Sequence, residues 1–177
     1  MKRCPACQKT YPHALAFCVS DASALEDTGV RAWGDLLQRD EPVDLARATR
    51  LAARLCDALQ AECAKGRVPP PLQPLDLELT GEGASEDVRV TFGVESSALT
   101  AKDGTLDGVA PYAAPEVLRK GPATPASAVY NAAVVLYESV TGRLPFSGST
   151  AAALVVRQML ERPPSPRSLR PELSAAL

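Results

Sequence analysis

The chain has 177 residues, enough for one domain of ordinary size and a small module, and its 46% apolar content with only 5% aromatic residues favours closely packed helices. The net charge of −2 argues against a broad surface for nucleic acid or for anionic lipid. No apolar run is long enough to cross a bilayer and no apolar signal core follows the basic amino terminus, so we expect a cytoplasmic protein without membrane contact.

Three of the five cysteines lie near the amino terminus, and in a cytoplasmic chain cysteines at such spacing are metal ligands more often than disulfides. Cys4 and Cys7 form a Cys-x2-Cys pair. At this spacing, a tight turn of the backbone lets both thiolates bind one tetrahedral zinc ion. Cys18 supplies a third thiolate. If the spacing of Cys4 and Cys7 repeats from Cys18, the fourth ligand is Asp21. His13 is the alternative fourth ligand. A metal-free cluster of reduced cysteines is the competing interpretation.

This segment resembles the short bacterial zinc ribbons of pattern CPxCGxxYPxxxxFCPxDGxxL. The match rests on Cys4, Pro5, Cys7, Tyr11, Pro12, Phe17, Cys18, Asp21 and Leu25. The chain departs from the pattern at Gln8 and Ala22, where the ribbons have glycines that relax the two turns. The resemblance implies a zinc ribbon over residues 1–27. Because so short a segment buries little apolar surface, we expect it to unfold when a chelator removes the metal.

After a connector at residues 28–43, an amphipathic helix is expected over residues 44–63. Its apolar side chains recur at spacings of three and four: Leu45, Ala48, Leu51, Ala52, Leu55, Leu59 and Cys63. Asp44 is the expected N-cap and Gly66 the expected stop. We expect the other cysteine of this helix, Cys56, to be a buried small hydrophobic residue like Cys63.

A β-hairpin is expected next. Leu75, Leu77 and Leu79 alternate with acidic residues, as in a half-buried strand, and a turn at 81–87 leads to a second strand at 88–92.

Two further helices follow. Residues 127–141 are apolar nearly all round, so this helix should be buried at the centre of the fold, and Gly142 ends it. The last helix is expected near residues 150–160, before a proline-rich tail that alone suggests a linker or docking peptide.

The order of these elements is that of the carboxy-terminal lobe of a protein kinase. GVAPYAAPE at residues 108–116 resembles GTPxYMAPE, and residues 129–146 resemble VYSLGVVLYELLTGRLPF. Residues 31–173 thus resemble the bacterial Ser/Thr protein kinase family. The expected fold is a zinc ribbon followed by a mainly α (α+β), partial protein-kinase C-lobe over residues 44–173, with a tail at 174–177 and the N-lobe absent.

The same alignment changes the residues that kinases use for phosphoryl transfer. PPPLQPLDLELT, residues 69–80, aligns with HRDLKPENILLT. Pro71 then stands in place of the catalytic Asp, Gln73 in place of the Lys, Asp76 in place of the metal-binding Asn and Thr91 in place of the DFG Asp. Asp76 keeps a carboxylate that can hold a cation. Val109 replaces the Thr of GTP, and Ala128 the buried Asp of the central helix.

These departures lead us to expect that the chain is not an enzyme. Residues 34–37 resemble the helix after the kinase hinge, and no glycine-rich loop or VAIK lysine precedes them, so no ATP is expected. We expect a catalytically inactive, pseudokinase-like adaptor or regulator in bacterial signalling. It would act by protein contact with a Ser/Thr kinase, with a kinase substrate or with a second copy. A full C-lobe continues with further helices, and the apolar surface they would cover is the expected interface, unless the tail folds over it.

Two alternatives are weaker. In the first alternative, the ribbon binds nucleic acid through Lys2, Arg3 and Lys9, but three cations provide few phosphate contacts. In the second alternative, another kinase phosphorylates the segment that resembles the activation segment, at Ser96, Ser97, Thr100 or Thr105. An ordinary polar loop is the preferred interpretation of this segment.

Overall fold

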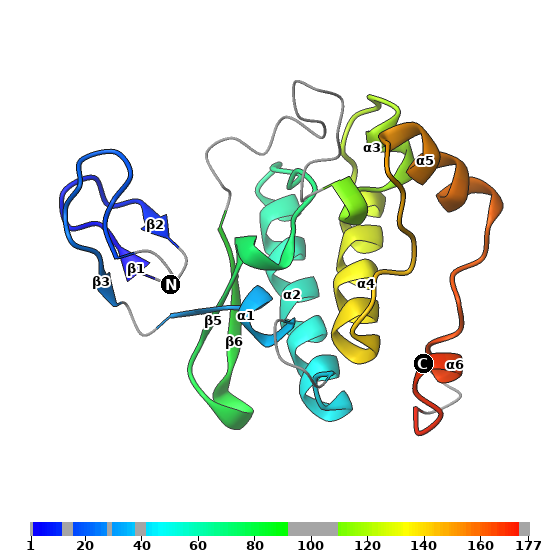
Figure 1. The fold of residues 1–177 in the computed structure, drawn as a ribbon, viewed down its shortest axis with the longest axis horizontal. Helices are drawn as coiled ribbons and strands as arrows, with labels where there is room; N and C mark the ends of the chain where they lie inside the picture. The colour runs from blue at the N-terminus through cyan, green and yellow to red at the C-terminus, as the bar shows by residue number, and fades with distance from the viewer. Residues whose placement is uncertain (1, 12–15, 28–29, 38–41, 92–109, 174–177) are drawn as a thin grey trace.

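The computed structural model describes residues 2–11, 16–27, 30–37, 42–91 and 110–173 of the chain. Figure 1 shows a small amino-terminal sheet beside a larger body, in which two long helices, α2 and α4, run next to each other and a second small sheet lies against α2. The fold is α+β, as expected.

The amino-terminal sheet consists of three strands of two residues each. In the order β2-β1-β3, they are Thr10–Tyr11, Lys2–Arg3 and Glu26–Asp27, all antiparallel. The buried residues of this region are Cys4 and Cys18, with Cys7 and Leu25 packed against them. So small an apolar cluster provides little stability by itself, because the hydrophobic contribution scales with buried area.

The second sheet has the order β4-β5-β6 and contains the expected hairpin. Its antiparallel strands are β4 Arg31–Ala32, β5 Leu77–Thr80 and β6 Asp87–Val90. Leu77 and Leu79 are fully buried in the main core, so the alternating pattern predicted their burial correctly. The strand begins later than expected. Leu75 lies in a 3-10 turn, η1 Pro74–Asp76, and is 38% exposed, because Pro74 and the Asp76 carboxylate favour a turn at this point. A second 3-10 turn, η2 Gly83–Ser85, joins β5 to β6.

The described part of the larger body contains six helices: four lie close to predicted helical segments, and two short ones, at residues 115–118 and 166–169, were not predicted. They are α1 Gly34–Leu37, α2 Leu45–Ala64, α3 Pro115–Leu118, α4 Pro125–Thr141, α5 Ala151–Leu160 and α6 Pro166–Leu169, with a 3-10 turn η3 at Ala110–Tyr112. Asp44 caps α2 by accepting a hydrogen bond from Arg47 N at 3.0 Å, as expected. Helix α4 begins two residues early because Thr124 and Ser127 form a capping box. Gly142 ends it with a φ of 71°.

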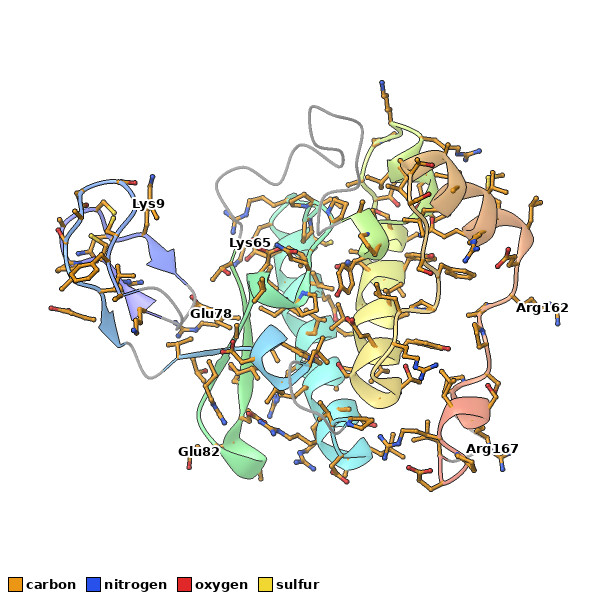
Figure 2. All side chains as sticks on the ribbon, in the orientation of Figure 1. Lys9, Lys65, Glu78, Glu82, Arg162 and Arg167 are labelled. Carbon is orange, nitrogen blue, oxygen red and sulfur yellow. The ribbon has the colours of Figure 1, made fainter. Side chains whose placement is uncertain are left out.

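Helix α4 is the central helix, and side chains fill the space between it and α2 (Figure 2). Its Ser139 is fully buried and accepts a hydrogen bond at 2.8 Å from the indole N–H of Trp33, which is also fully buried. This bond ties the start of the larger body to its centre. The cysteines of α2 differ from expectation. Cys56 is exposed because it lies away from the apolar stripe formed by Leu51, Leu55 and Leu59. Cys63 continues this stripe at the end of the helix and is half-buried.

The proline-rich tail packs back onto the larger body. Tyr137 donates a hydrogen bond to the Pro164 carbonyl at 2.9 Å, and Leu173 is 2% exposed within the main core. Arg162 and Arg167 project outward from this segment (Figure 2). Among the described helices, none combines the length and the apolar character that a membrane span requires.

Candidate functional site

The first Cys-x2-Cys turn is a closed knuckle. Cys4 N donates to the Lys9 carbonyl at 2.9 Å, and Gln8 N donates back to the Cys4 carbonyl at 3.0 Å. The backbone N–H of Cys7 points at Cys4 Sγ at 3.3 Å, as the spacing predicted. An N–H group aimed at sulfur favours the thiolate, which is the form that binds a metal.

A second knuckle repeats the first one. Cys18 N donates to the Ser23 carbonyl at 2.8 Å, and Ala22 N donates to the Cys18 carbonyl at 2.9 Å. Ser20 N points at Cys18 Sγ at 3.4 Å. Asp21 therefore occupies in this knuckle the place that the second cysteine occupies in the first one.

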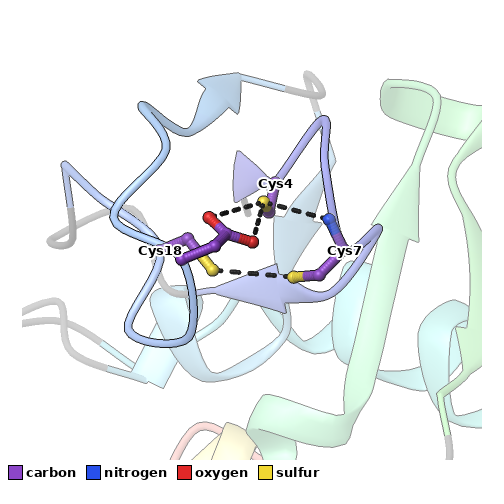
Figure 3. A group of neighbouring side chains, drawn as sticks. Cys4, Cys7 and Cys18 are labelled. Atoms are coloured by element: carbon purple, nitrogen blue, oxygen red, sulfur yellow. Dashed lines mark hydrogen bonds between the residues drawn. The ribbon is translucent and has the colours of Figure 1, made fainter.

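The two knuckles bring four ligand side chains together. The ligand atoms of Cys4, Cys7, Cys18 and Asp21 all lie within 4.8 Å of one another. Cys7 Sγ is 3.5 Å from Cys18 Sγ, and Cys4 Sγ is 3.3 Å from Asp21 Oδ2 (Figure 3). A tetrahedral ion with bonds of about 2.3 Å to sulfur would hold two thiolates about 3.8 Å apart. The residues thus lie close enough to bind a metal ion. The alternative ligand His13 lies outside the described residues.

The electrostatics of the cluster also suit a cation. Hydrogen bonds from Ser23, Cys18 and Cys4 hold the pKa of the Asp21 carboxyl well below its usual range, so this group is ionised at neutral pH. Burial raises the pKa of the Cys4 thiol, which donates a hydrogen bond to that carboxylate. A divalent cation would replace this proton and offset part of the negative charge of the thiolates and the carboxylate.

A second group of residues surrounds the loop that aligns with the kinase catalytic loop. Asn131 of α4 is 3% exposed and accepts a hydrogen bond from Leu72 N at 3.3 Å. Its amide N–H group donates to the Leu72 carbonyl at 2.6 Å and to the Tyr112 carbonyl at 3.2 Å. Asn131 therefore fixes the loop and the segment before α3 to the central helix.

Sequence reasoning missed this anchor. The alignment pointed to Ala128, where kinases have a buried Asp, and found no polar group there. Asn131 lies one turn further along the same helix. The available signal was a lone amide side chain in an otherwise apolar stretch, because a buried polar side chain needs hydrogen-bond partners.

The structure joins three of the four residues at the kinase-aligned positions by hydrogen bonds: Gln73, Asp76 and Thr91. Thr91 donates from both its N–H and its hydroxyl to the Asp76 carbonyl, at 2.8 Å each. The Asp76 carboxylate accepts a hydrogen bond from Gln73 N at 3.0 Å and so closes the turn η1. Pro71 and Gln73 are half-buried on the same loop. The segment after Thr91, with Val109 and the four candidate phosphorylation sites, lies outside the described residues.

The segment that resembles the end of the kinase activation segment is held by side chains from two helices. The Tyr112 hydroxyl donates to Glu138 Oε2 at 2.7 Å, and burial raises the pKa of Glu138. Gln158 of α5 donates to the Ala113 carbonyl at 3.2 Å. The segment is therefore an integral part of the packing.

Comparisons with known proteins agree with the kinase resemblance. No protein-family model matches the chain. The chain is 31% identical over 146 residues to the probable serine/threonine-protein kinase CE0033 of Corynebacterium efficiens. It is 33% identical over 138 residues to the serine/threonine-protein kinase PkaA of Streptomyces coelicolor, and 33% identical over 131 residues to PknA of Mycobacterium tuberculosis.

The three matches cover 79%, 75% and 73% of the chain, and only 22%, 25% and 30% of the respective kinases. The chain thus spans less than a third of the length of these relatives. The similarity confirms that most of the chain is kinase-like.

The comparisons contradict the prediction that the chain is not an enzyme. Several named Ser/Thr protein kinases match most of its length, and this similarity points to a kinase. The prediction rested on single aligned positions such as Pro71 and Gln73.

Proposed function

We propose that the protein is a kinase-like component of bacterial Ser/Thr signalling that binds another protein through its C-lobe-like part and carries a zinc ribbon at residues 1–27. The C-lobe-like part would comprise residues 44–173. The partner would be a Ser/Thr kinase, a kinase substrate or a second copy of the chain.

One observation carries the proposal of protein contact. Helix α5 buries a single residue, Leu154, and exposes Val156 by 54%, Met159 by 55% and Leu160 by 79%. Positions i, i+3 and i+4 share one face of a helix, so these three side chains form one apolar patch. Contiguous exposed apolar surface of this kind is typical of an interaction site.

The experiment is a capture of binding partners from lysate of the native host, with and without nuclease. We expect a protein to be retained by the wild type after nuclease and lost from a Met159→Glu/Leu160→Glu variant. Val19→Glu is the matched control, because Val19 is 77% exposed but lies on the ribbon. Retention that is equal in both variants would contradict binding at α5. Capture that disappears with nuclease would support a nucleic-acid ligand instead.

Zinc is the metal that best suits three thiolates and one carboxylate in a closed set of four ligands. Elemental analysis of the purified chain should find one zinc per molecule. Asp21→Ala should weaken zinc binding by at least about tenfold, because it removes one of the four ligands. Glu26→Ala, an exposed acidic neighbour in β3, should leave binding unchanged.

Since the relatives are kinases, phosphoryl transfer is the activity to measure. The assay supplies labelled ATP with Mg²⁺ or Mn²⁺ and follows label on the chain and on added protein substrates. Asp76 aligns with the metal-binding Asn of kinases and would be the carboxylate that holds a divalent cation, so transfer by this chain would fall in Asp76→Ala. Transfer should persist in Glu82→Ala, a variant of an exposed residue in the turn before η2.

A further inference from the structure

The three thiols of the metal cluster make different contacts. Cys7 Sγ contacts Cys18 Sγ at 3.5 Å. Cys4 Sγ instead donates a hydrogen bond to the Asp21 carboxylate at 3.3 Å and accepts one from Cys7 N. Cys18 also hydrogen-bonds the Asp21 carboxylate. The sulfurs of Cys7 and Cys18 nevertheless lie in direct contact, as the formation of a disulfide requires.

The three thiols also differ in access to solvent. Cys4 is fully buried and Cys18 is 3% exposed, whereas Cys7 is half-buried. A small oxidant in solution therefore meets Cys7 first, because the reactivity of a cysteine toward oxidants depends on thiolate character and on access.

We propose that this cluster is also a site of reversible oxidation, at which a peroxide joins Cys7 to Cys18 in a disulfide and the metal is released. The inference rests on the proposed zinc site. The two sulfurs must approach from 3.5 Å to about 2.05 Å. The product leaves only Cys4 and Asp21 as ligands, and two ligands do not form a closed tetrahedral zinc site.

The reaction is balanced with hydrogen peroxide as the oxidant. The Cys7 thiolate attacks one peroxide oxygen, the O–O bond breaks, and a sulfenic acid and a hydroxide ion form. The Cys18 thiolate then attacks the sulfenic sulfur, so that the S–S bond forms, the S–O bond breaks and a second hydroxide leaves. Two protons from solvent convert both hydroxides to water. The two electrons that reduce the peroxide come from the two sulfurs, and a thiol reductant reverses the process.

The test uses the full chain with Cys56→Ser and Cys63→Ser, so that only the three ligand cysteines remain. The zinc-loaded protein is treated with hydrogen peroxide. Zinc release is followed with a chromophoric chelator, and the disulfide is mapped by trypsin digestion and mass spectrometry after alkylation. We expect one zinc released per disulfide, fragment 4–9 joined to fragment 10–31, and the alkyl group on Cys4. A disulfide that uses Cys4, or zinc release without a disulfide, would overturn the proposal.

Two variants sharpen the result. Cys4→Ser should still form the Cys7–Cys18 link, whereas Cys18→Ser should accumulate sulfenic acid at Cys7 that a dimedone probe labels. Loss of the link in Cys4→Ser would count against the assignment. The zinc content before oxidation tests the metal site separately from the disulfide. Protein isolated without zinc would contradict the zinc site but not the disulfide, because the cross-link can also be mapped in the reduced, metal-free chain.

Discussion

At the scale of single residues, the two knuckles show backbone strain at equivalent positions. Gln8 has a φ of 60° and Ala22 a φ of 56°, both in the left-handed region that favours glycine. The zinc ribbons that this segment resembles have glycine at both positions. Gln8 and Ala22 therefore destabilise the two knuckles relative to glycine, while the fold of the knuckles is retained.

Glycine at these positions should strengthen the metal module. We expect Gln8→Gly and Ala22→Gly to stabilise it by about 1 kcal/mol each, which is about a fivefold gain in zinc affinity. Gln8 would also lose its hydrogen bond to the Pro5 carbonyl, but that bond is exposed and contributes little. The measurement is zinc competition against a chelator of known affinity. Lys9→Gly is the control, since Lys9 has no positive φ; an equal gain there would contradict the explanation.

Asn131 should be the most sensitive polar residue of the larger body. Asn131→Ala leaves the Leu72 N–H group and the carbonyls of Leu72 and Tyr112 without this partner in a buried environment. We expect the free energy of unfolding to fall by about 3 kcal/mol, measured by urea denaturation. Ala133→Ser, an exposed change on the same helix, should stay within about 0.5 kcal/mol of the wild type.

At the scale of secondary-structure elements, a buried carboxylate joins β4, α2 and the hairpin. Glu86 is 6% exposed and accepts two hydrogen bonds from Arg47, at 2.9 and 2.7 Å, and one from Arg31 at 3.0 Å. The paired, two-bond geometry is the strong form of an Arg–carboxylate contact. Glu86 therefore fixes where the turn η2 lies against α2.

This network predicts a specific dependence of stability on pH. Hydrogen bonds from Arg47 lower the pKa of Glu86 below its ordinary value, although burial opposes the shift. The stability that Glu86 contributes is then fully present above the ordinary glutamate pKa and is lost as the pH falls through the lowered, folded-state pKa. Glu86→Gln should reduce the free energy of unfolding at pH 7, and the difference from wild type should shrink toward pH 3. A difference that does not change with pH would contradict this role.

Local patterns predicted the elements, whereas contacts distant in sequence were not visible. The periodicity of Leu51, Leu55 and Leu59 and the capping residue Asp44 predicted α2 because both signals act within one helix. The spacing of the cysteines predicted the cluster because each ligand pair lies within one tight turn. The late start of β5 was missed because the Leu75–Leu79 alternation continues through a turn. The role of Asn131 was missed because its main-chain partner Leu72 is 59 residues away.

At the scale of the whole molecule, the described residues form two separate buried clusters. The small one contains the cysteines of the amino-terminal sheet, and the large one is built on α2, α4 and the hairpin. The stability of the first cluster should depend on the metal, and that of the second on buried apolar area.

Removal of the metal should therefore unfold one part of the chain only. After treatment with a strong chelator, we expect backbone amides of the amino-terminal sheet to lose protection from hydrogen exchange, while amides of α2 and α4 keep it. Hydrogen exchange with mass spectrometry resolves the two parts. Equal loss in both would show that the clusters unfold together, and an unchanged amino-terminal sheet would show that the metal does not stabilise it.

Arg170 links the tail to two distant positions in the larger body. Its guanidinium donates to the Val43 carbonyl at 3.2 Å, just before α2, and to the Val140 carbonyl at 2.9 Å, near the end of α4. Leu173 then adds its side chain to the main core. Any shortened version of the kinase-like part used for crystals or binding studies should therefore include Leu173. A chain cut within the preceding prolines would expose the last turn of α4 and present an artificial apolar surface to its partners.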